Sequence, residues 1–300
     1  MSRRMVAAGY ERVDFDDVAD VYVINTCSVT NIAARKSRQM IHKCKKLNPK
    51  ACVVAAGCYV QSFGKDIAEE LGADIIIGNN KKNDLVSKVH EYFQNMGEHA
   101  GPILDCFDIN RGNVEYENMV IEKDSEHTRA FVKVQDGCNQ FCTYCIIPFA
   151  RGRIRSRQIP DVVTEVTGLA KAGYKEVVIT GIHLSSFGSG TEYGLADLIE
   201  SIHDIDGIER IRLGSLEPQI VTDDFAKRLA ALSKFCAHFH LSLQSGCDTV
   251  LVRMNRKYTI AEYTKGVEIL RKHFDNPAIT TDIIVGFPGE SEEEFHTTLE

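Results

Sequence analysis

Apolar and polar positions in the first third of the chain alternate between strand-like and helix-like patterns. Short apolar runs bounded by turn residues predict buried strands, and longer stretches with a 3.6-residue period predict amphipathic helices. The predicted strands are 20–25, 52–56 and 74–78, and the predicted helices are 31–47, 66–71 and 83–93. Such alternation implies a parallel sheet with ligands at the carboxyl ends of its strands. We therefore expect an N-terminal parallel-sheet α/β domain over residues 1–95.

The same alternation returns over residues 128–300. The predicted strands are 130–135, 176–180, 210–215, 238–243 and 279–285, and the predicted helices are 160–172, 195–203, 222–234, 260–273 and a last one from 291. Five βα units in series predict a partial or complete barrel with its active site at the carboxyl ends of the strands. Polar residues follow those ends at 180–183, Glu217, Gln244 and Asp282. Residues 96–127 are polar and lack periodicity, which indicates a linker.

Composition narrows the class of protein. Of the 300 residues, 44% are hydrophobic and 26% charged, which is typical of globular proteins. No apolar run has membrane-spanning length, and the N-terminus does not resemble a secretory signal. Ten cysteines in such a chain indicate metal ligands or free thiols in a reducing cytoplasm. The net charge of −7 gives no global attraction for nucleic acid, so any RNA site must be a local basic patch.

Three cysteines with the spacing Cys-x3-Cys-x2-Cys follow the predicted strand 130–135. They are Cys138, Cys142 and Cys145. Three thiolates can hold a four-iron cluster and leave one iron without a protein ligand. That iron can bind a substrate or cofactor, so the spacing indicates chemistry. The alternatives are a zinc site with a fourth ligand elsewhere, although zinc usually takes a nearby fourth ligand, and three buried thiols.

Several segments of the chain resemble the radical S-adenosylmethionine (SAM) enzymes of the methylthiotransferase family, and the resemblance covers almost the whole length. The segments are VINTCSVTN (23–31), GCYVQ (57–61), GCNQFCTYCIIPFARGRIRSR (137–157), VITGIH (178–183), LQSG (243–246) and TDIIVGFPGE (281–290). Residues 151–157 and 180–183 favour the MtaB type, which modifies N6-threonylcarbamoyladenosine in tRNA. The related types act on isopentenylated adenosine in tRNA and on a ribosomal-protein aspartate.

The resemblance implies that the three cysteines hold a 4Fe-4S cluster, which binds SAM and cleaves it to a 5′-deoxyadenosyl radical. Such a radical removes an unactivated hydrogen, which ionic side-chain chemistry cannot do. Tyr144 would lie against the adenine of SAM, and Glu217 and Gln244 could bind its ribose or amino-acid part. Alternatively, Tyr144 is a core aromatic residue, and Glu217 and Gln244 make hydrogen bonds at the rim of the barrel.

The same resemblance implies a second 4Fe-4S cluster that supplies sulfur. Cys27 and Cys58 lie just past predicted strands and match two of its ligands. The third ligand ends an upstream strand that is missing here, so we expect this cluster to be incomplete. A sixth barrel strand and an RNA-binding β-barrel domain would follow residue 300, so we expect a fragment truncated at both ends. The remaining cysteines are expected to be buried or half-buried thiols: Cys44, Cys52, Cys106, Cys236 and Cys247.

Four arginines alternate near the cysteine triad, and in an extended segment they would share one face. They are Arg151, Arg153, Arg155 and Arg157. We interpret them as candidates for contacts with RNA phosphates, with solvated charge as the alternative. The basic helix at 31–47 is a second candidate, for which a solvated face is the alternative.

We therefore expect a cytoplasmic transferase that methylthiolates C2 of N6-threonylcarbamoyladenosine next to the anticodon of tRNA. One cluster would generate the radical, the second would supply sulfur, and a second SAM would supply the methyl group. The expected partners are tRNA, a sulfur donor and an electron-donor protein of the flavodoxin or ferredoxin type, with no membrane. The alternatives are an enzyme acting on isopentenylated adenosine, a non-catalytic metal- or RNA-binding module, and an inactive truncated product.

Overall fold

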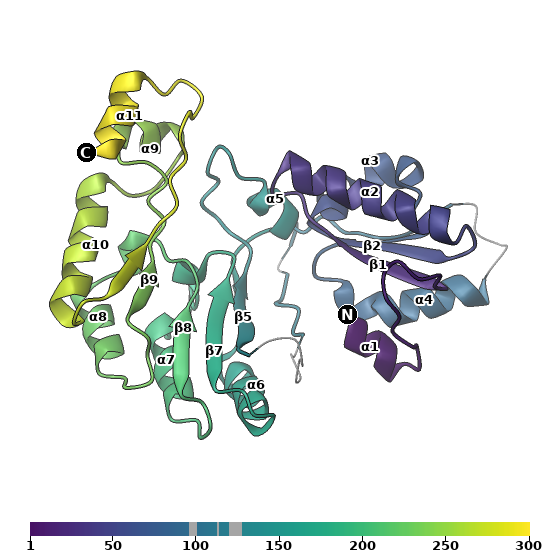
Figure 1. The fold of residues 1–300 in the computed structure, drawn as a ribbon, viewed down its shortest axis with the longest axis horizontal. Coiled ribbons are helices and arrows are strands. Elements are labelled where there is room, and N and C mark those ends of the chain that lie inside the picture. The colour runs from purple at the N-terminus through teal and green to yellow at the C-terminus, as the bar shows by residue number, and fades with distance from the viewer. Residues whose placement is uncertain (96–100, 113, 120–127) are drawn as a thin grey trace. The chain divides into compact units, whose positions relative to one another are not determined.

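The computed structural model describes residues 1–95, 101–112, 114–119 and 128–300, which form two compact units (Figure 1). The first unit comprises Met1–Met119 and Cys145–Arg153, and the second comprises Val120–Tyr144 and Ile154–Glu300. The stretch that begins at the third cysteine of the triad thus belongs to the first unit. Within the described ranges, no helix is both long enough and apolar enough to cross a lipid bilayer.

A four-stranded parallel sheet forms the centre of the first unit. Its strands are β1 (Val21–Thr26), β2 (Cys52–Gly57), β3 (Ile75–Ile77) and β4 (Ile103–Asp105), in the order β1-β2-β3-β4. The first three were predicted. β4 lies in the stretch 96–127 that we expected to be a linker; its short run pairs with β3 and is too brief to show periodicity. Within that stretch, residues 96–100, 113 and 120–127 lie outside the described residues.

Helices cover both faces of this sheet. They are α1 (Ser2–Ala7), α2 (Asn31–Leu47), α3 (Cys58–Leu71) and α4 (Leu85–Gln94), which follows the short helix η1 (Lys82–Asp84). Alternate side chains of a strand point to opposite faces. Val53 and Ala55 of β2 therefore share a core with α2 and α3, whereas Val54 and Ala56 share one with α1 and α4. Burial on both faces explains the continuous apolar run of β2.

The second unit is a partial barrel, as the sequence predicted. β5 (Ala130–Asp136), β7 (Glu176–Gly181) and β8 (Arg210–Leu213) are parallel, and β9 (His238–His240) pairs in parallel with β10 (Ala278–Thr280). Isolated bridges continue the order from β8 to β9 and β10: Ile211↔Phe235, Leu216↔Leu241 and Gln244↔Ile283. A short antiparallel strand, β6 (Arg155–Ser156), lies on the outer edge of β5.

Four helices pack against one face of these strands: α6 (Ile159–Lys171), α7 (Leu195–His203), α8 (Asp223–Ala230) and α10 (Ile260–His273) (Figure 1). Strand residues such as Ile179 and Phe239 meet helix residues such as Leu198 in one continuous core. Loops and short helices follow the carboxyl ends of the strands. The short helices are η2 (Leu184–Ser186), η3 (Pro218–Ile220), α9 (Asp248–Arg253) and α11 (Glu292–Leu299).

Candidate functional site

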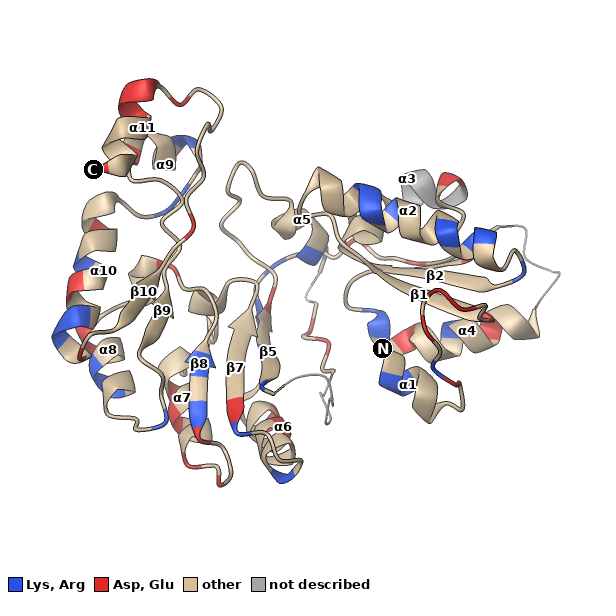
Figure 2. Ribbon diagram, in the orientation of Figure 1, with Lys and Arg blue, Asp and Glu red and all other residues tan. Residues whose placement is uncertain are grey.

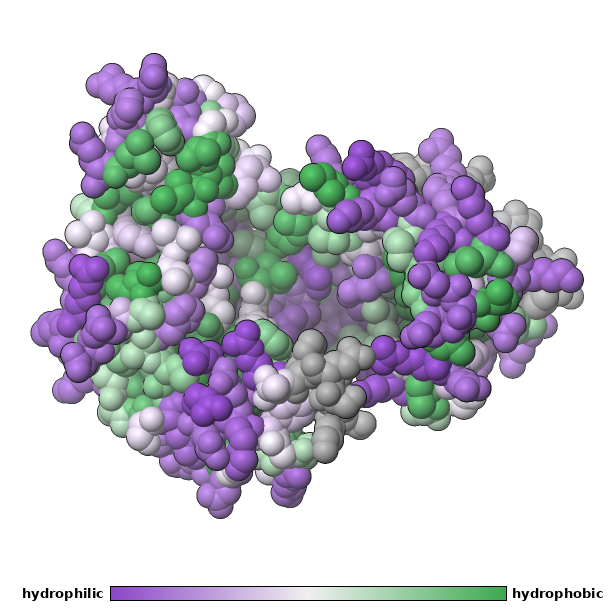
Figure 3. Space-filling view, viewed as in Figure 1, coloured by the Kyte–Doolittle hydropathy of each residue, from purple (hydrophilic) through white to green (hydrophobic). Residues whose placement is uncertain are grey.

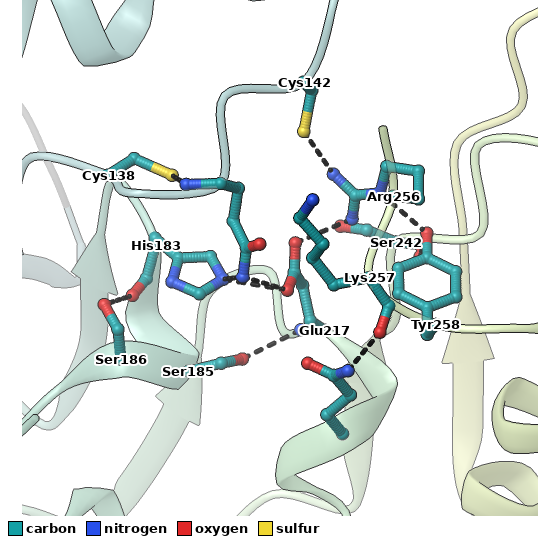
Figure 4. A network of polar contacts seen from close by, with 12 residues as sticks. Cys138, Cys142, His183, Ser185, Ser186, Glu217, Ser242, Arg256, Lys257 and Tyr258 are labelled. Atoms are coloured by element: carbon teal, nitrogen blue, oxygen red, sulfur yellow. Dashed lines mark hydrogen bonds and ion pairs between the residues drawn. The ribbon is translucent and has the colours of Figure 1, made fainter. Parts of the chain in front are cut away.

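A buried carboxylate lies just beyond the carboxyl end of β8. Glu217 is 6% exposed, and its Oε1 accepts a hydrogen bond from Arg256 Nη2 at 2.8 Å. Its Oε2 accepts one from Gln140 Nε2 at 3.0 Å and lies 3.0 Å from His183 Nε2 (Figure 4). The backbone N–H of Glu217 donates to Ser185 Oγ at 2.8 Å. Segments that are far apart in the sequence therefore converge on one side chain, which confirms that this strand end gathers polar groups.

Charge pairing outweighs burial at this carboxylate. Burial disfavours the ionised form, but His183 and Arg256 hold the pKa of Glu217 below its ordinary value. Burial likewise opposes the guanidinium, and the carboxylate of Glu217 raises the pKa of Arg256 in spite of it. The site therefore keeps one fixed negative and one fixed positive charge in a position shielded from water, and such a pair can orient a ligand that carries both charges.

Arg256 also connects this carboxylate to the cysteine triad. Its Nη1 donates to Cys142 Sγ at 3.2 Å, and its Nε donates to Tyr258 Oη at 3.2 Å. The guanidinium lies 4.9 Å from the centre of the Tyr258 ring. The Tyr258 hydroxyl in turn donates to the carbonyl oxygen of Ser242, which follows β9. Figure 4 shows Arg256 between Glu217 and Cys142, so its orientation is fixed from several sides.

The segment that follows α9 holds the backbone around the first two cysteines. Asn255 Nδ2 donates to the carbonyl oxygens of Gln140 and Phe141, at 3.2 and 2.8 Å. The N–H of Thr143 donates to the carbonyl oxygen of Met254 at 3.1 Å. These bonds join positions more than a hundred residues apart and fix the loop from which the thiols project.

The surroundings of Cys138 and Cys142 fit the sulfurs that hold an iron–sulfur cluster. Cys138 Sγ accepts a hydrogen bond from the N–H of Gln140 at 3.5 Å, and Cys142 Sγ accepts one from Arg256. N–H donors and positive charge stabilise thiolates and iron–sulfur clusters. Cys145 belongs to the first unit. Among the described residues, no three His, Cys, Asp or Glu side chains lie close enough together to hold a metal ion.

The other two residues predicted to touch SAM lie at the surface or are half-buried. Tyr144 is 42% exposed, which does not fit a core aromatic residue, and its ring meets the edge of Phe287 at 6.3 Å between centres. Gln244 has a φ of +68° and is fixed through its backbone N–H, which donates to the carbonyl oxygen of Asp282 at 2.9 Å. The structure thus places Gln244 beside the strand end of β10 and Tyr144 beside the loop after it.

Two cysteines of the first unit lie at neighbouring positions on the carboxyl edge of its sheet. Thr26 of β1 is in register with Gly57 of β2, and Cys27 and Cys58 are the residues that directly follow these two parallel strands. Gly57 permits this turn into α3, because its φ is +108° and an added Cβ would lie 2.7 Å from the carbonyl oxygen of Thr26. Cys58 is the first residue of α3 and therefore lies at the positive end of the helix dipole.

Cys58 is surrounded by nitrogen donors. It is 4% exposed, and its Sγ accepts hydrogen bonds from Arg151 Nε at 3.0 Å and from Asn79 Nδ2 at 3.6 Å. Asn79 Nδ2 also donates to the carbonyl oxygen of Ala150 at 2.7 Å. These bonds tie α5 (Ile147–Arg151), the short helix after Cys145, to the edge that carries Cys58.

The predicted stripe of four arginines is wrong as a geometric prediction. Arg151 ends α5, and Gly152 follows with a φ of +73°, so the alternation does not run along one extended strand. Arg153 is exposed. Arg155 is 7% exposed and lies 3.7 Å from a carboxylate oxygen of Asp136. Arg157 is 3% exposed and forms an ion pair with Glu165 of α6. Spacing alone could not reveal the helix or the buried acids that receive two of these side chains.

The remaining cysteines are buried or half-buried thiols, as expected: Cys44, Cys52, Cys106, Cys236 and Cys247. Burial raises the pKa of Cys44 to about 11 and that of Cys52 to about 12. Both therefore remain protonated near neutral pH and serve as apolar core residues.

Sequence reasoning identified Glu217 but missed the residues that fix it. Gln140 lies within the triad itself, and Arg256 lies in the polar segment Met254-Asn-Arg-Lys-Tyr258 between two helices. That polar run, which lies between α9 and α10 in the connection from β9 to β10, was the available signal. Nothing in the sequence pointed to Asn79 as a neighbour of Cys58.

Comparison with known families divides the chain into two matched regions. Residues 132–300 match the Radical SAM superfamily, and residues 1–78 match Uncharacterized protein family UPF0004. The first match covers more than half of the chain and includes the whole cysteine triad.

Curated relatives align over nearly all of the chain. The threonylcarbamoyladenosine tRNA methylthiotransferases MtaB of Bacillus subtilis and of Aquifex aeolicus are 41% and 42% identical to it, over 97% and 100% of its residues. The tRNA-2-methylthio-N(6)-dimethylallyladenosine synthase of Clostridium novyi is 38% identical over 97%. The chain spans 64%, 72% and 65% of the lengths of these three relatives, respectively.

Solved structures support the fold. The chain resembles the radical SAM methyltransferase TsrM of Kitasatospora setae with a TM-score of 0.68 and 16% identity, over 93% of this chain and 59% of TsrM. It resembles the cobalamin-dependent SAM radical enzyme OxsB with a TM-score of 0.63 and 11% identity, over 100% of this chain and 45% of OxsB. Together, the superfamily match and the Aquifex relative, 72% of which is covered, establish that the chain belongs to the methylthiotransferase family of radical SAM proteins.

Proposed function

We propose that this chain methylthiolates C2 of N6-threonylcarbamoyladenosine next to the anticodon of tRNA. The observation that carries the proposal is the adjacency of Cys27 and Cys58 on one sheet edge, in a chain that also has the Cys138 triad. The triad alone is compatible with any radical SAM reaction, whereas a second thiol site in the same chain fits sulfur insertion. The 41% and 42% identity to enzymes named for threonylcarbamoyladenosine supports the choice of base.

The cysteine triad would generate the radical. Cys138, Cys142 and Cys145 would hold a 4Fe-4S cluster, which together with SAM supplies a 5′-deoxyadenosyl radical when bound. Arg256 fixes the surroundings of this cluster, because it donates hydrogen bonds to Cys142 Sγ and to the carboxylate of Glu217. The fixed charges of Arg256 and Glu217 would orient the charged groups of SAM.

Tyr144 and Gln244 are proposed to complete the SAM site. The exposed ring of Tyr144 offers a flat apolar surface to an adenine, and Gln244 at the β9–β10 edge offers an amide to a ribose or amino-acid group.

The first unit would supply the sulfur. Cys27 and Cys58 would be ligands of a second 4Fe-4S cluster. Arg151 and Asn79 fit such a role, because N–H donors to a ligating sulfur stabilise its negative charge. A sulfur donor, an electron-donor protein of the flavodoxin or ferredoxin type and a cytoplasmic location belong to the same proposal.

Mass spectrometry of tRNA nucleosides tests the proposed substrate. The gene is expressed in a strain that lacks its own methylthiotransferases, and the digested tRNA is analysed. We expect the methylthio derivative of threonylcarbamoyladenosine to appear. If the methylthio derivative of dimethylallyladenosine appears instead, the chain would belong to the type for which the Clostridium novyi relative is named. The absence of both products would favour a non-catalytic module.

A further inference from the structure

The outward face of α2 is cationic in an otherwise acidic chain. The helix contains six Lys and Arg residues and no Asp or Glu, while the net charge of the chain is −7. The cations are Arg35, Lys36, Arg38, Lys43, Lys45 and Lys46. In Figure 2, α2 carries blue segments and no red one, and Figure 3 shows mainly hydrophilic side chains over it. A local concentration of this kind creates the positive patch that the net charge does not provide.

Half of these cations are paired within the first unit. Lys45 pairs with Asp74, Lys43 pairs with Asp16, and Arg38 donates to the hydroxyl of Tyr59. The side chains of Arg35, Lys36 and Lys46 are exposed, and no hydrogen bond or ion pair joins them to any other described residue. Their charges are therefore available to a partner. Core burial does not explain them, because the inward face of α2 packs through Ile41 and Cys44.

The exposed basic residues lie in a row along the helix and do not converge on one point. Arg35, Arg38, His42 and Lys46 follow one another at intervals of three, four and four residues, so they share one face of the helix. At about 1.5 Å per residue the row is about 16 Å long. A row of this length matches successive phosphates along a polynucleotide strand, whereas a single small anion is held by donors that converge on one point.

The row begins near the proposed sulfur site. α2 starts at Asn31, and the N–H of Cys27 donates to Ser37 Oγ of α2 at 3.2 Å. Arg38 lies over the ring of Tyr59, and the ring centre of Tyr59 is 5.5 Å from that of Phe63 of α3, which is 41% exposed. An exposed aromatic ring next to cations suits nucleic acid better than an acidic protein, because bases stack on such rings.

We propose that the outward face of α2, made up of Arg35, Lys36, Arg38, His42 and Lys46, is a docking surface for the phosphate backbone of the tRNA substrate. The proposal rests on the proposed function, which requires RNA to reach the edge that carries Cys27. RNA lying along this face would have one end of the contact beside that edge.

Equilibrium binding of tRNA at several salt concentrations tests this surface. The probe is a tRNA transcript, and the proteins are the wild-type chain, a variant with Arg35→Gln, Lys36→Gln and Lys46→Gln, and a matched control. The control carries Lys227→Gln, Lys265→Gln and Arg271→Gln, which remove the same charge from exposed positions on α8 and α10. Glutamine is a good helix former, so circular dichroism should show an unchanged fold.

We expect the α2 variant to bind about 10-fold or more weakly at moderate salt, with a slope of log K against log salt reduced by about 2 units, while the control keeps the wild-type slope. Equal binding by all three proteins would overturn the surface but leave the proposed function intact. A wild-type chain that binds no tRNA at low salt would overturn both. Unchanged tRNA binding with impaired reduction by a flavodoxin would reassign the surface to an acidic protein and overturn the RNA proposal.

Discussion

Arg256 and Glu217 form a buried ion pair, with 2.8 Å between Nη2 and Oε1 and side chains that are each 7% exposed. Because the same guanidinium reaches Cys142, the pair connects the end of β8 to the cysteine loop. Removing one partner of a buried ion pair leaves the other charge uncompensated. The free-energy cost of that charge exceeds the stabilisation that the intact pair provides.

Arg256→Met is therefore expected to lower the free energy of unfolding by about 3–5 kcal/mol, because Glu217 loses its cation. Urea unfolding measures the change. Arg271→Met, at an exposed position of α10, should change it by less than about 0.5 kcal/mol. Adding Glu217→Gln to Arg256→Met should recover part of the loss; a double variant less stable than the single one would contradict the pairing.

A second prediction concerns Arg151 and the proposed sulfur site. Arg151→Met removes the 3.0 Å hydrogen bond to Cys58 Sγ, and the loss of such an outer partner typically weakens metal binding by about 10–100-fold. Iron retained in competition with a chelator measures the effect. Arg153→Met is the matched control from the exposed side of the same segment. Equal iron retention in both variants would rule out a role for Arg151 at Cys58.

The buried pair between Arg157 and Glu165 gives a prediction that separates folding from RNA contact. Glu165→Ala should lower the free energy of unfolding by about 3–5 kcal/mol, because Arg157 is left buried and charged. Replacing both residues by Met should restore much of that stability. If Arg157 contacted RNA, the double variant would bind tRNA more weakly than the wild-type chain; we expect the same affinity.

The contact between α9 and α11 is predicted to weaken at low pH. Arg253, Thr249 and the N–H of Ser291 lower the pKa of Glu294 from 4.5 to about 2. A carboxylate whose pKa is lowered in the folded state stabilises the fold fully when the pH is above the ordinary pKa of 4.5. That contribution is lost as the pH falls from 4.5 toward 2. The difference in urea midpoint between wild type and Glu294→Gln should thus be present at about pH 6 and shrink below about pH 4. Glu293→Gln is the exposed control, and a difference that stays constant would refute the assignment.

The alternation of apolar runs was sufficient to predict both α/β units and most of their strands. Each of these elements has a face or a stripe that must be buried, and such patterns are visible locally. The start of α3 at Cys58, earlier than the predicted 66, was missed because no polar turn residues separate the strand from the first turn of the helix. β4 and β6 escaped because two or three residues carry no periodicity and depend on their partner strands.

The candidate site was predictable where function depends on position along a strand and unpredictable where it depends on tertiary contacts. Cys27 and Cys58 follow strands of the first sheet, and Glu217 follows a strand of the second unit. The carboxyl ends of neighbouring parallel strands in one sheet lie at the same edge. The arginines differ: Arg151 and Arg157 are two polar residues in the same run, yet one donates to a thiol and the other pairs with a buried acid. The position of Arg151 depends on the turn at Gly152 and on α3, which is distant in the sequence, whereas that of Arg157 depends on how α6 packs eight residues further along the chain.

Reductive cleavage of SAM by cysteine variants tests the central claim, which is that the two sets of cysteines have separate roles. The chain is reconstituted with iron and sulfide without oxygen, reduced, and assayed for 5′-deoxyadenosine. We predict that the wild-type chain and Cys58→Ser both produce it, whereas Cys142→Ser does not. Undiminished production by Cys142→Ser, or its loss in a correctly folded Cys58→Ser variant, would contradict the account.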